Sequence, residues 1–179
     1  MTPEELGRLF PISLLPYDPE WPGYFQLEKE RIENALGARN VYRMEHIGST
    51  AIPGMMAKPS IDILLEVVQS ADQQMITSRF TQLGYHFIPK PDNPPPYMMF
   101  VKGYTLEGLV GQPFHVHVRY PGDWDEVHFR DYLIAHAGKA AEYEQLKIGL
   151  SKRYKNDREG YTGAKTNFIR EVLQLAREP

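Results

Sequence analysis

The sequence has no cysteine among its 179 residues, which excludes a disulfide framework, a zinc site built on thiolates and a cysteine nucleophile. It also lacks any uncharged apolar run near the roughly 20 residues that span a bilayer. Its first residues have neither the basic part nor the apolar part of a secretory signal. We therefore expect no membrane association and a cytoplasmic location.

An excess of positive charge is missing as well. The formal net charge of -3 gives no general attraction for nucleic acid or for an anionic membrane, so no nucleic-acid partner is expected. A phosphate-bearing ligand would have to be met by a local cluster of basic residues. The 42% hydrophobic and 24% charged residues are ordinary for a globular protein, and the length suits a single domain over residues 1–179.

The pattern of apolar residues predicts a mixed sheet with helices around it, an α/β (α+β) architecture. The clearest strand is 61–68 (IDILLEVV), which we expect to be central. After an extended lead-in over 1–19, the other predicted elements are strands at 41–47, 85–88, 97–102 and 114–120, and helices at 18–36, 71–83 and from 124 to the end, with breaks near 138 and across 156–163.

A glycine–serine pair and an aspartate lie where two of these strands could present them. Gly48 and Ser49 directly follow the strand 41–47, and backbone amides in such a turn can cradle a phosphate. An ordinary tight turn is the alternative. Asp62 lies within an otherwise apolar strand, where an unpaired carboxylate would be costly. It is either a metal-binding or catalytic group or a buried aspartate satisfied by the backbone or by Lys58.

Two histidines are spaced so that both could contact the same ligand. His115 and His117 are two residues apart on a predicted strand, so their side chains share a face, about 7 Å apart at Cα. They could converge on a metal or a phosphate, or form a solvated strand face. With Asp62 and His46 they make a mixed nitrogen and oxygen set that suits zinc, manganese or iron better than magnesium. His46 could instead orient the glycine–serine turn.

The C-terminal segment offers a second place for an anion. Thr162 is a plausible N-cap, which would put Lys165 in the first turn of the last helix. A cation there opposes the helix dipole at a cost of about 0.3–1 kcal/mol, and a bound phosphate would reverse that sign. Lys152 and Arg153 either join this site or belong to a solvated basic face.

The segment 46–62 (HIGSTAIPGMMAKPSID) resembles the signature of the GrpB family. The resemblance covers nearly the whole chain and continues through PYDPEW at 16–21, FHVHV at 114–118, RDYL at 130–133 and YTGAK at 161–165. It implies the nucleotidyltransferase fold, the superfamily that includes DNA polymerase β and aminoglycoside nucleotidyltransferases. In some relatives, such a domain is similar to one fused to dephospho-CoA kinase.

The superfamily's acidic pattern is only partly present. It places Gly-Ser after one strand, two acids one residue apart on the next, and a third acid on a neighbouring strand. Asp62 matches the first acid, Leu64 stands at the second, and a histidine of the pair replaces the third. Glu66 is about 13 Å along the strand from Asp62, so we interpret it as a charge near a strand end. A two-magnesium site needs more oxygen ligands than these.

We predict a protein that binds a nucleotide or another phosphorylated small molecule, with transfer or hydrolysis at phosphorus if it is an enzyme. A catalytically silent binding or accessory module, for example one linked to CoA metabolism, is the alternative, and a metal-dependent hydrolase is a third. The predicted catalytic residues are Asp62 and His117; the phosphate-binding residues are Gly48, Ser49, Thr50, Lys58 and Lys165; the ligands of a divalent metal (zinc, manganese or magnesium) are Asp62, His115, His117 and His46.

Overall fold

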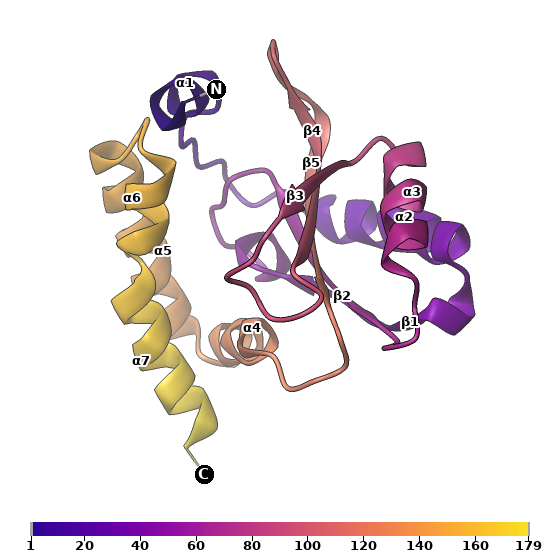
Figure 1. Ribbon diagram of the computed structural model, residues 1–179. Helices are drawn as coiled ribbons and strands as arrows, with labels where there is room; N and C mark the ends of the chain where they lie inside the picture. The colour runs from indigo at the N-terminus through magenta and orange to yellow at the C-terminus, as the bar shows by residue number, and fades with distance from the viewer. Residues whose placement is uncertain (1, 179) are drawn as a thin grey trace.

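A five-stranded mixed sheet forms the centre of the computed structural model, which describes residues 2–178 (Figure 1). The strand order is β1-β2-β5-β4-β3. β2 and β5 pair in parallel and the other neighbours pair antiparallel, so the predicted mixed sheet is confirmed. The middle position belongs to β5 rather than to β2. The strands are β1 (Val41–Ile47), β2 (Ile61–Val67), β3 (His86–Pro89), β4 (Met98–Thr105) and β5 (Gly108–Arg119).

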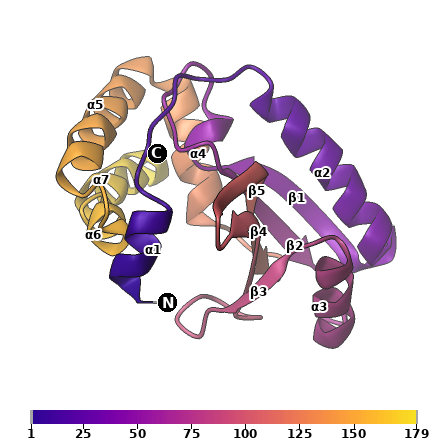
Figure 2. The ribbon, with the colours of Figure 1, turned by 90° about the horizontal axis from the view of Figure 1, so that it is seen from above.

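Helices cover both faces of the sheet. On one side lie α2 (Trp21–Leu36) and α3 (Gln73–Gln82), and on the other lies the C-terminal group of helices (Figures 1 and 2). Because β2 is covered on both faces, its sequence is a nearly continuous apolar run rather than an alternating one. The C-terminal group consists of α4 (Asp125–Ala135), α5 (Ala137–Arg153), α6 (Arg158–Gly163) and α7 (Thr166–Arg177).

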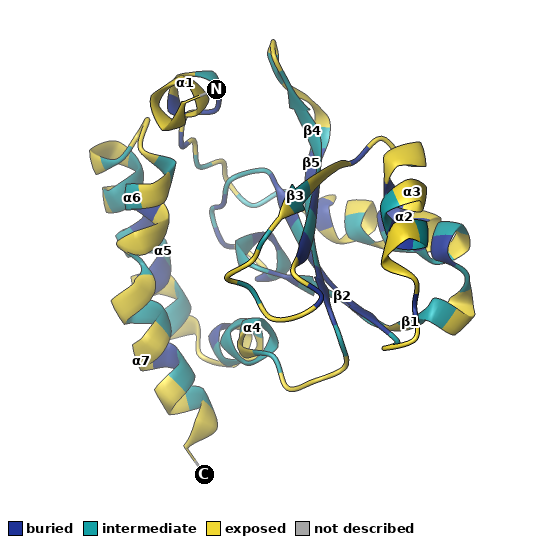
Figure 3. Cartoon of the chain, in the orientation of Figure 1, coloured by how far each residue is buried: buried dark blue, intermediate teal, exposed yellow. Residues whose placement is uncertain are grey.

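The main hydrophobic core lies on the side of α2 and α3. Alternate strand residues such as Ile63 and Val116 belong to this core together with Ile32 and Phe80, and all four are fully buried. The buried segments of the chain are dark blue in Figure 3. A smaller apolar cluster joins α4, α5 and α7 to the loop after β1. The alternation of side chains along β2 and β5 therefore leaves their polar residues on the opposite face, toward the C-terminal helices.

The first residues are more ordered than the sequence pattern predicts. In place of an extended lead-in there is a short helix, α1 (Pro3–Leu9), with a capping box at its start: Thr2 Oγ1 accepts from Glu5 N, and the Glu5 carboxylate accepts from Thr2 N. The proline that suggested irregular backbone stands at the first helical position, where its missing N–H costs nothing.

The segment after α1 runs across the molecule and ties distant parts of the chain together. Ile12 N donates to Lys155 O at 2.7 Å, and Arg158 Nη1 donates to Phe10 O at 2.8 Å. An isolated bridge then pairs Leu15 with Ala57. This strap holds the end of α5 and the start of α6 beside the loop that leads into β2.

One expectation for the C-terminal region is confirmed and the others are wrong. The predicted break near Gly138 falls at His136, between α4 and α5. The region 156–163 is not a break throughout, because α6 forms there with Asp157 as its N-cap, accepting from Gly160 N at 2.8 Å. Thr162 is inside α6 and caps nothing. Lys165 occupies the N-cap position of α7 rather than its first turn, so the predicted dipole penalty does not apply in that form.

Over residues 2–178, no helix combines the length and the apolar character needed to cross a membrane.

Candidate functional site

A pocket of about 550 Å³ lies between the polar face of the sheet and helices α5 and α6. Eight of the nine residues predicted for the site line it, although they come from the loop after β1, from β2 and β5, and from the start of α7. These eight are Gly48, Ser49, Thr50, Lys58, Asp62, His115, His117 and Lys165.

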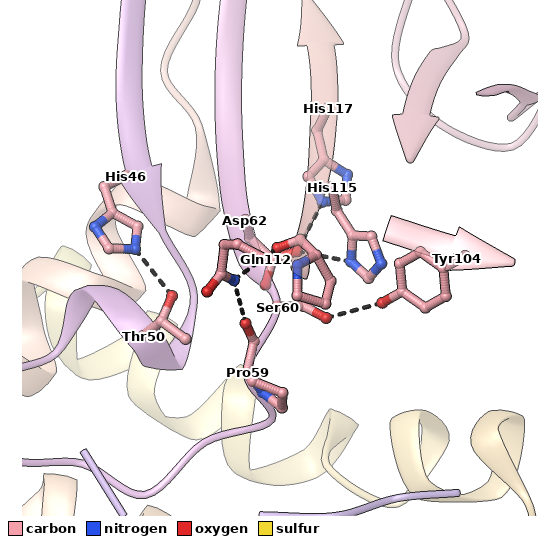
Figure 4. Close-up of polar contacts among 10 residues, drawn as sticks. His46, Thr50, Pro59, Ser60, Asp62, Tyr104, Gln112, His115 and His117 are labelled. Carbon is pink, nitrogen blue, oxygen red and sulfur yellow. Dashed lines mark hydrogen bonds and ion pairs between the residues drawn. The ribbon is translucent and has the colours of Figure 1, made fainter. Parts of the chain in front are cut away.

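The Asp62 carboxylate lies at the centre of this group, against both histidines (Figure 4). Parallel pairing of β2 with β5 sets Asp62 beside His115, and Oδ1 is 3.2 Å from His115 Nδ1 and 3.4 Å from His117 Nε2. Burial alone would raise the pKa of Asp62, but the hydrogen bonds from both imidazoles together hold it below its ordinary value. The carboxylate is therefore ionised and fixes the orientation of both rings.

Each ring keeps one nitrogen free of Asp62. When an N–H points at the carboxylate, the other nitrogen of a neutral imidazole is an acceptor. That acceptor is Nε2 in His115 and Nδ1 in His117. The His115 ring also stacks on Tyr104, with centroids 5.2 Å apart, and the Tyr104 hydroxyl is 2.8 Å from Ser60 Oγ. His115 is thus held from two sides.

The turn after β1 approaches Asp62 through backbone that only glycine suits. Gly48 has φ 73° and ψ -173°, a region essentially closed to other residues. A Cβ built there would lie 2.8 Å from Asp62 Oδ2. Ser49 follows in a short 3₁₀ turn (Ser49–Ala51) at the pocket wall. Gly48 therefore lies directly against the aspartate, 14 positions away in sequence.

Three lysines, Lys58, Lys147 and Lys165, line the same pocket. The Nζ atoms of Lys58 and Lys165 lie 5.5 and 4.5 Å from the centroid of the Tyr161 ring. Lys147 is 2% exposed, and its ammonium donates to Met56 O. Burial and the neighbouring lysines lower the pKa of Lys147 to about 7.

The same two causes act on the other lysines. Burial and the Lys58 charge lower the pKa of Lys165 to about 8, and burial with the Arg158 charge lowers the pKa of Lys58. The full set of basic residues on the pocket wall is Lys58, Lys90, Arg119, Lys147, Arg158 and Lys165, against the carboxylates of Asp62 and Glu126. An anion in this pocket would offset both the lost hydration of these positive charges and their mutual repulsion.

The structure places His46 outside this group, which corrects the expectation that it belongs with Asp62. His46 pairs with Ile63 in the β1–β2 ladder, so its side chain shares the face of Ile63 rather than that of Asp62. Figure 4 shows it beside Thr50, away from the two other histidines. Its ring stacks on Phe25 at 5.0 Å, and Nε2 is 2.9 Å from Thr50 Oγ1. Burial lowers the pKa of His46 to about 4, so the ring is neutral. Its contact with Thr50 agrees with the alternative that it orients the turn.

The donor set does not fit a two-magnesium centre. Among residues 2–178, no group of three or more histidine, aspartate or glutamate side chains is placed to hold a metal ion. Leu64 is fully buried at the position of the second acid, and the surrounding basic residues oppose a second divalent cation. Asp62, His115 and His117, predicted as ligands of a single ion, are hydrogen-bonded to one another and form no such group in this arrangement.

Glu66 lies one residue before the end of β2, near the strand end as the sequence suggested. It is completely buried and forms an ion pair with Arg43. Its Oε1 also accepts from Gly122 N and from Trp124 Nε1, both at 2.9 Å. Glu66 therefore fixes the connection between β5 and α4 and has no part in the Asp62 group.

Several residues of the pocket were not found from the sequence. Lys152 and Arg153, considered for the anion site, are exposed and do not line the pocket, and Lys147 takes that place. A signal was present, because Tyr143 and Lys147 are four residues apart and so share one face of a predicted helix. The other lining residues missed at that level include Arg119, Glu126, Arg158 and Tyr161.

Fold and site define a class of α/β protein in which a glycine–serine turn and a strand aspartate meet beside a basic pocket. Residues 11–175 match the model of the GrpB protein family. The chain belongs to the GrpB family.

Known proteins of similar sequence and structure agree with this family. A UPF0157 protein of Pseudomonas aeruginosa is 40% identical over 166 residues, covering 92% of this chain and 67% of that protein. The crystal structure of conserved protein GrpB from Enterococcus faecalis superposes with a TM-score of 0.79 at 26% identity, covering 92% of this chain and 96% of that one. A dephospho-CoA kinase of Mycolicibacterium paratuberculosis is 29% identical, over 93% of this chain but only 46% of the kinase.

Proposed function

We propose that this protein binds a phosphorylated small molecule, a nucleotide or another phosphate ester, in the pocket between the sheet and helices α5 and α6. The observation that carries the proposal is the trio Lys58, Lys147 and Lys165, which are held close together with lowered pKa values. Asp62 alone cannot neutralise them. A phosphate group, with two negative charges near neutral pH, supplies what the trio lacks.

The opposite wall supports the same ligand. The turn at Gly48 and Ser49 brings backbone close to the pocket, as turns that cradle phosphates do. A strand, a glycine–serine turn and an aspartate on the next strand are also similar to the nucleotidyltransferase fold. The relative named dephospho-CoA kinase extends the range of candidate phosphate esters to CoA and its precursors.

Chemistry at phosphorus is the second candidate, favoured by the contacts of Asp62 with the two histidines. With its Nδ1–H directed at Asp62, the pocket-lining His115 has Nε2 as an acceptor. A hydroxyl or water that attacks a bound phosphate would transfer its proton to such a nitrogen, and the ionised carboxylate would stabilise the resulting imidazolium. The leaving oxygen would take a proton from solvent or from a neighbouring lysine ammonium.

Lys165→Ala and Lys152→Ala together test the binding proposal. Lys165 is in the pocket, whereas Lys152 is an exposed lysine on α5 with the same charge. Thermal-shift and calorimetric titrations with ATP, CoA and inorganic pyrophosphate should show stabilisation of the wild type, about 2.7 kcal/mol at 100 times the dissociation constant. Lys165→Ala should bind at least about tenfold more weakly, the effect of losing one buried charged contact, and Lys152→Ala should bind normally. Equal binding by both variants would contradict the proposal.

A further inference from the structure

The end of the pocket away from the lysine trio contains a buried guanidinium with an unused donor. Arg119, the last residue of β5, is 4% exposed and lines the pocket. Its Nη1 donates to Val118 O at 3.0 Å, and its Nη2 is 3.6 Å from Glu126 Oε1. Its Nε is buried and has no hydrogen-bond partner within residues 2–178. A buried donor of a charged group is costly to leave without an acceptor, so a small shift of the side chain that brings this N–H to a ligand acceptor is favourable.

Contacts with Trp124 hold the Arg119 guanidinium in place before any ligand binds. The guanidinium lies over the Trp124 ring, 5.7 Å from the centroid, and the Trp124 indole donates to the buried Glu66. These contacts fix the plane of the guanidinium without using Nε. The side chain therefore pays little entropy when a ligand binds.

Distance separates Arg119 from the proposed phosphate position. Lys58 and Lys165 act on Asp62 electrostatically, and Asp62 is beside His115. Arg119 is four residues further along β5 than His115, about 13 Å at Cα. A phosphate held beside Asp62 lies at the His115 end of this stretch, and Arg119 lies at the other end. A ligand that meets both ends of the pocket is elongated, with its phosphate at one end and a different group at the other.

The residues around Arg119 describe that different group. Glu126 and Phe129 are three residues apart on α4 and both line the pocket, as does Met99, which pairs with His117 in the sheet. A carboxylate here disfavours a second phosphate. Arg119 supplies a donor, Glu126 an acceptor, and Phe129 and Met99 apolar surface. Such a set suits a flat heterocycle that has its own donors and acceptors at its edge and can stack on side chains.

We infer that Arg119, Glu126, Met99 and Phe129 form a nucleobase subsite, so that the ligand of this pocket is a nucleotide rather than a simple phosphate ester. The inference rests on the proposed phosphate-binding function. Arg119 donates from Nε to an acceptor on the base edge, and Glu126 accepts from an adjacent N–H. Met99 and Phe129 contact the ring.

Calorimetric titrations with AMP, GMP, ribose 5-phosphate and inorganic phosphate test this subsite. At least one nucleotide should bind the wild type about tenfold or more tightly than ribose 5-phosphate, the gain expected from stacking and one edge contact. Glu126→Gln should remove most of that preference and leave the affinity for ribose 5-phosphate unchanged. Glu142→Gln, an exposed carboxylate change outside the pocket, should behave as the wild type.

Arg119→Lys is the second variant, because it keeps the charge but lacks the guanidinium fork. It should also lose the preference for the nucleotide, with circular dichroism confirming its fold; if it does not fold, Glu126→Gln decides alone. Equal binding of nucleotides and ribose 5-phosphate to the wild type would overturn the subsite and leave the phosphate pocket standing. No binding by any of the four probes would instead overturn the proposed function.

Discussion

The backbone of Gly48 lies so close to the Asp62 carboxylate that a Cβ at position 48 would be 2.8 Å from Oδ2. Gly48→Ala should therefore destabilise the protein by about 1–3 kcal/mol, since it combines a backbone conformation reserved for glycine with a displaced aspartate. It should also weaken phosphate-ester binding, because the turn has to move. Denaturant unfolding and calorimetric titration of the variant measure the two effects.

Gly54→Ala is the matched control for that change. Gly54 has φ 79° but no atom within 4 Å of a built Cβ, so alanine meets backbone strain there without a collision. It should lose less stability than Gly48→Ala and keep its affinity for phosphate esters. If both variants lose the same stability and neither loses affinity, the contact with Asp62 has no role in binding.

Asp62→Asn separates binding from catalysis. The amide keeps the shape of the carboxylate but removes a negative charge beside the proposed phosphate position, so ATP should bind as well as before or more tightly. Any turnover should fall by at least about a hundredfold, because the histidines lose the anion that orients them. Asp131→Asn, an exposed change outside the pocket, should alter neither. Weaker ATP binding with unchanged turnover would contradict both roles of Asp62.

Lys147 makes phosphate binding depend on pH. Its pKa in the folded protein is about 7, below the ordinary 10.5, through burial and the charges of Lys165 and Lys58, with Glu144 acting in the opposite direction. Between these values the unfolded chain binds more protons than the folded chain, so this lysine makes the ligand-free protein more stable as pH rises from about 7 to 10.5. A bound phosphate favours the charged form of Lys147, so phosphate binding in that pH range should be accompanied by uptake of a proton by this lysine.

The affinity for inorganic pyrophosphate should consequently fall as pH rises from 7 to 9, by up to about tenfold per unit for each lysine involved. Calorimetry in two buffers of different ionisation enthalpy measures the proton uptake directly. Lys147→Gln should bind more weakly at pH 7 and show a shallower pH dependence. A pH-independent affinity in the wild type would show that the lysine is charged before the ligand arrives.

A single transition-metal ion, where one binds, should depend on His117 and not on His46. His117 contacts Asp62 in the pocket, whereas His46 faces the other side of the sheet against Phe25. Equilibrium dialysis against zinc should show uptake by the wild type and by His46→Gln, and a clear loss in His117→Ala. Equal uptake by all three proteins would place any zinc outside this site, and no uptake by the wild type would remove the metal from the proposal.

Much of the sheet could be predicted because its signals are local. The strand at 61–67 is a compact run of branched apolar residues, and the pair at 115 and 117 shows its shared face through a two-residue period. The pairing of Asp62 with His115 also needs the parallel register of those two strands, which the structure supplies. His46 was misplaced because a one-residue difference in strand register moves a side chain to the other face, and sequence does not show register.

The wall formed by the C-terminal helices could not be predicted in the same way. Lys147 is buried only because α5 turns it toward the loop at Met56, a contact between residues 91 positions apart. The capping box at Thr2 was a readable local signal, but the prolines nearby obscured it. The role of Glu66 could not be predicted for the same reason as that of Lys147, because its three partners become neighbours only after the chain has folded.

The position of the lysine trio has a consequence for how firmly the two layers of the protein hold together. Lys147 and Lys165 come from the helical layer and Lys58 from the loop that enters the sheet, so their repulsion acts across the junction of the layers. The strap through Ile12 and its bond to Lys155 opposes that repulsion on one side. An anion in the pocket acts as a counterion shared by both layers. Amide hydrogens of α5 and α6 would then exchange with solvent more slowly when the pocket is filled, because the opening that exposes them must also release the anion.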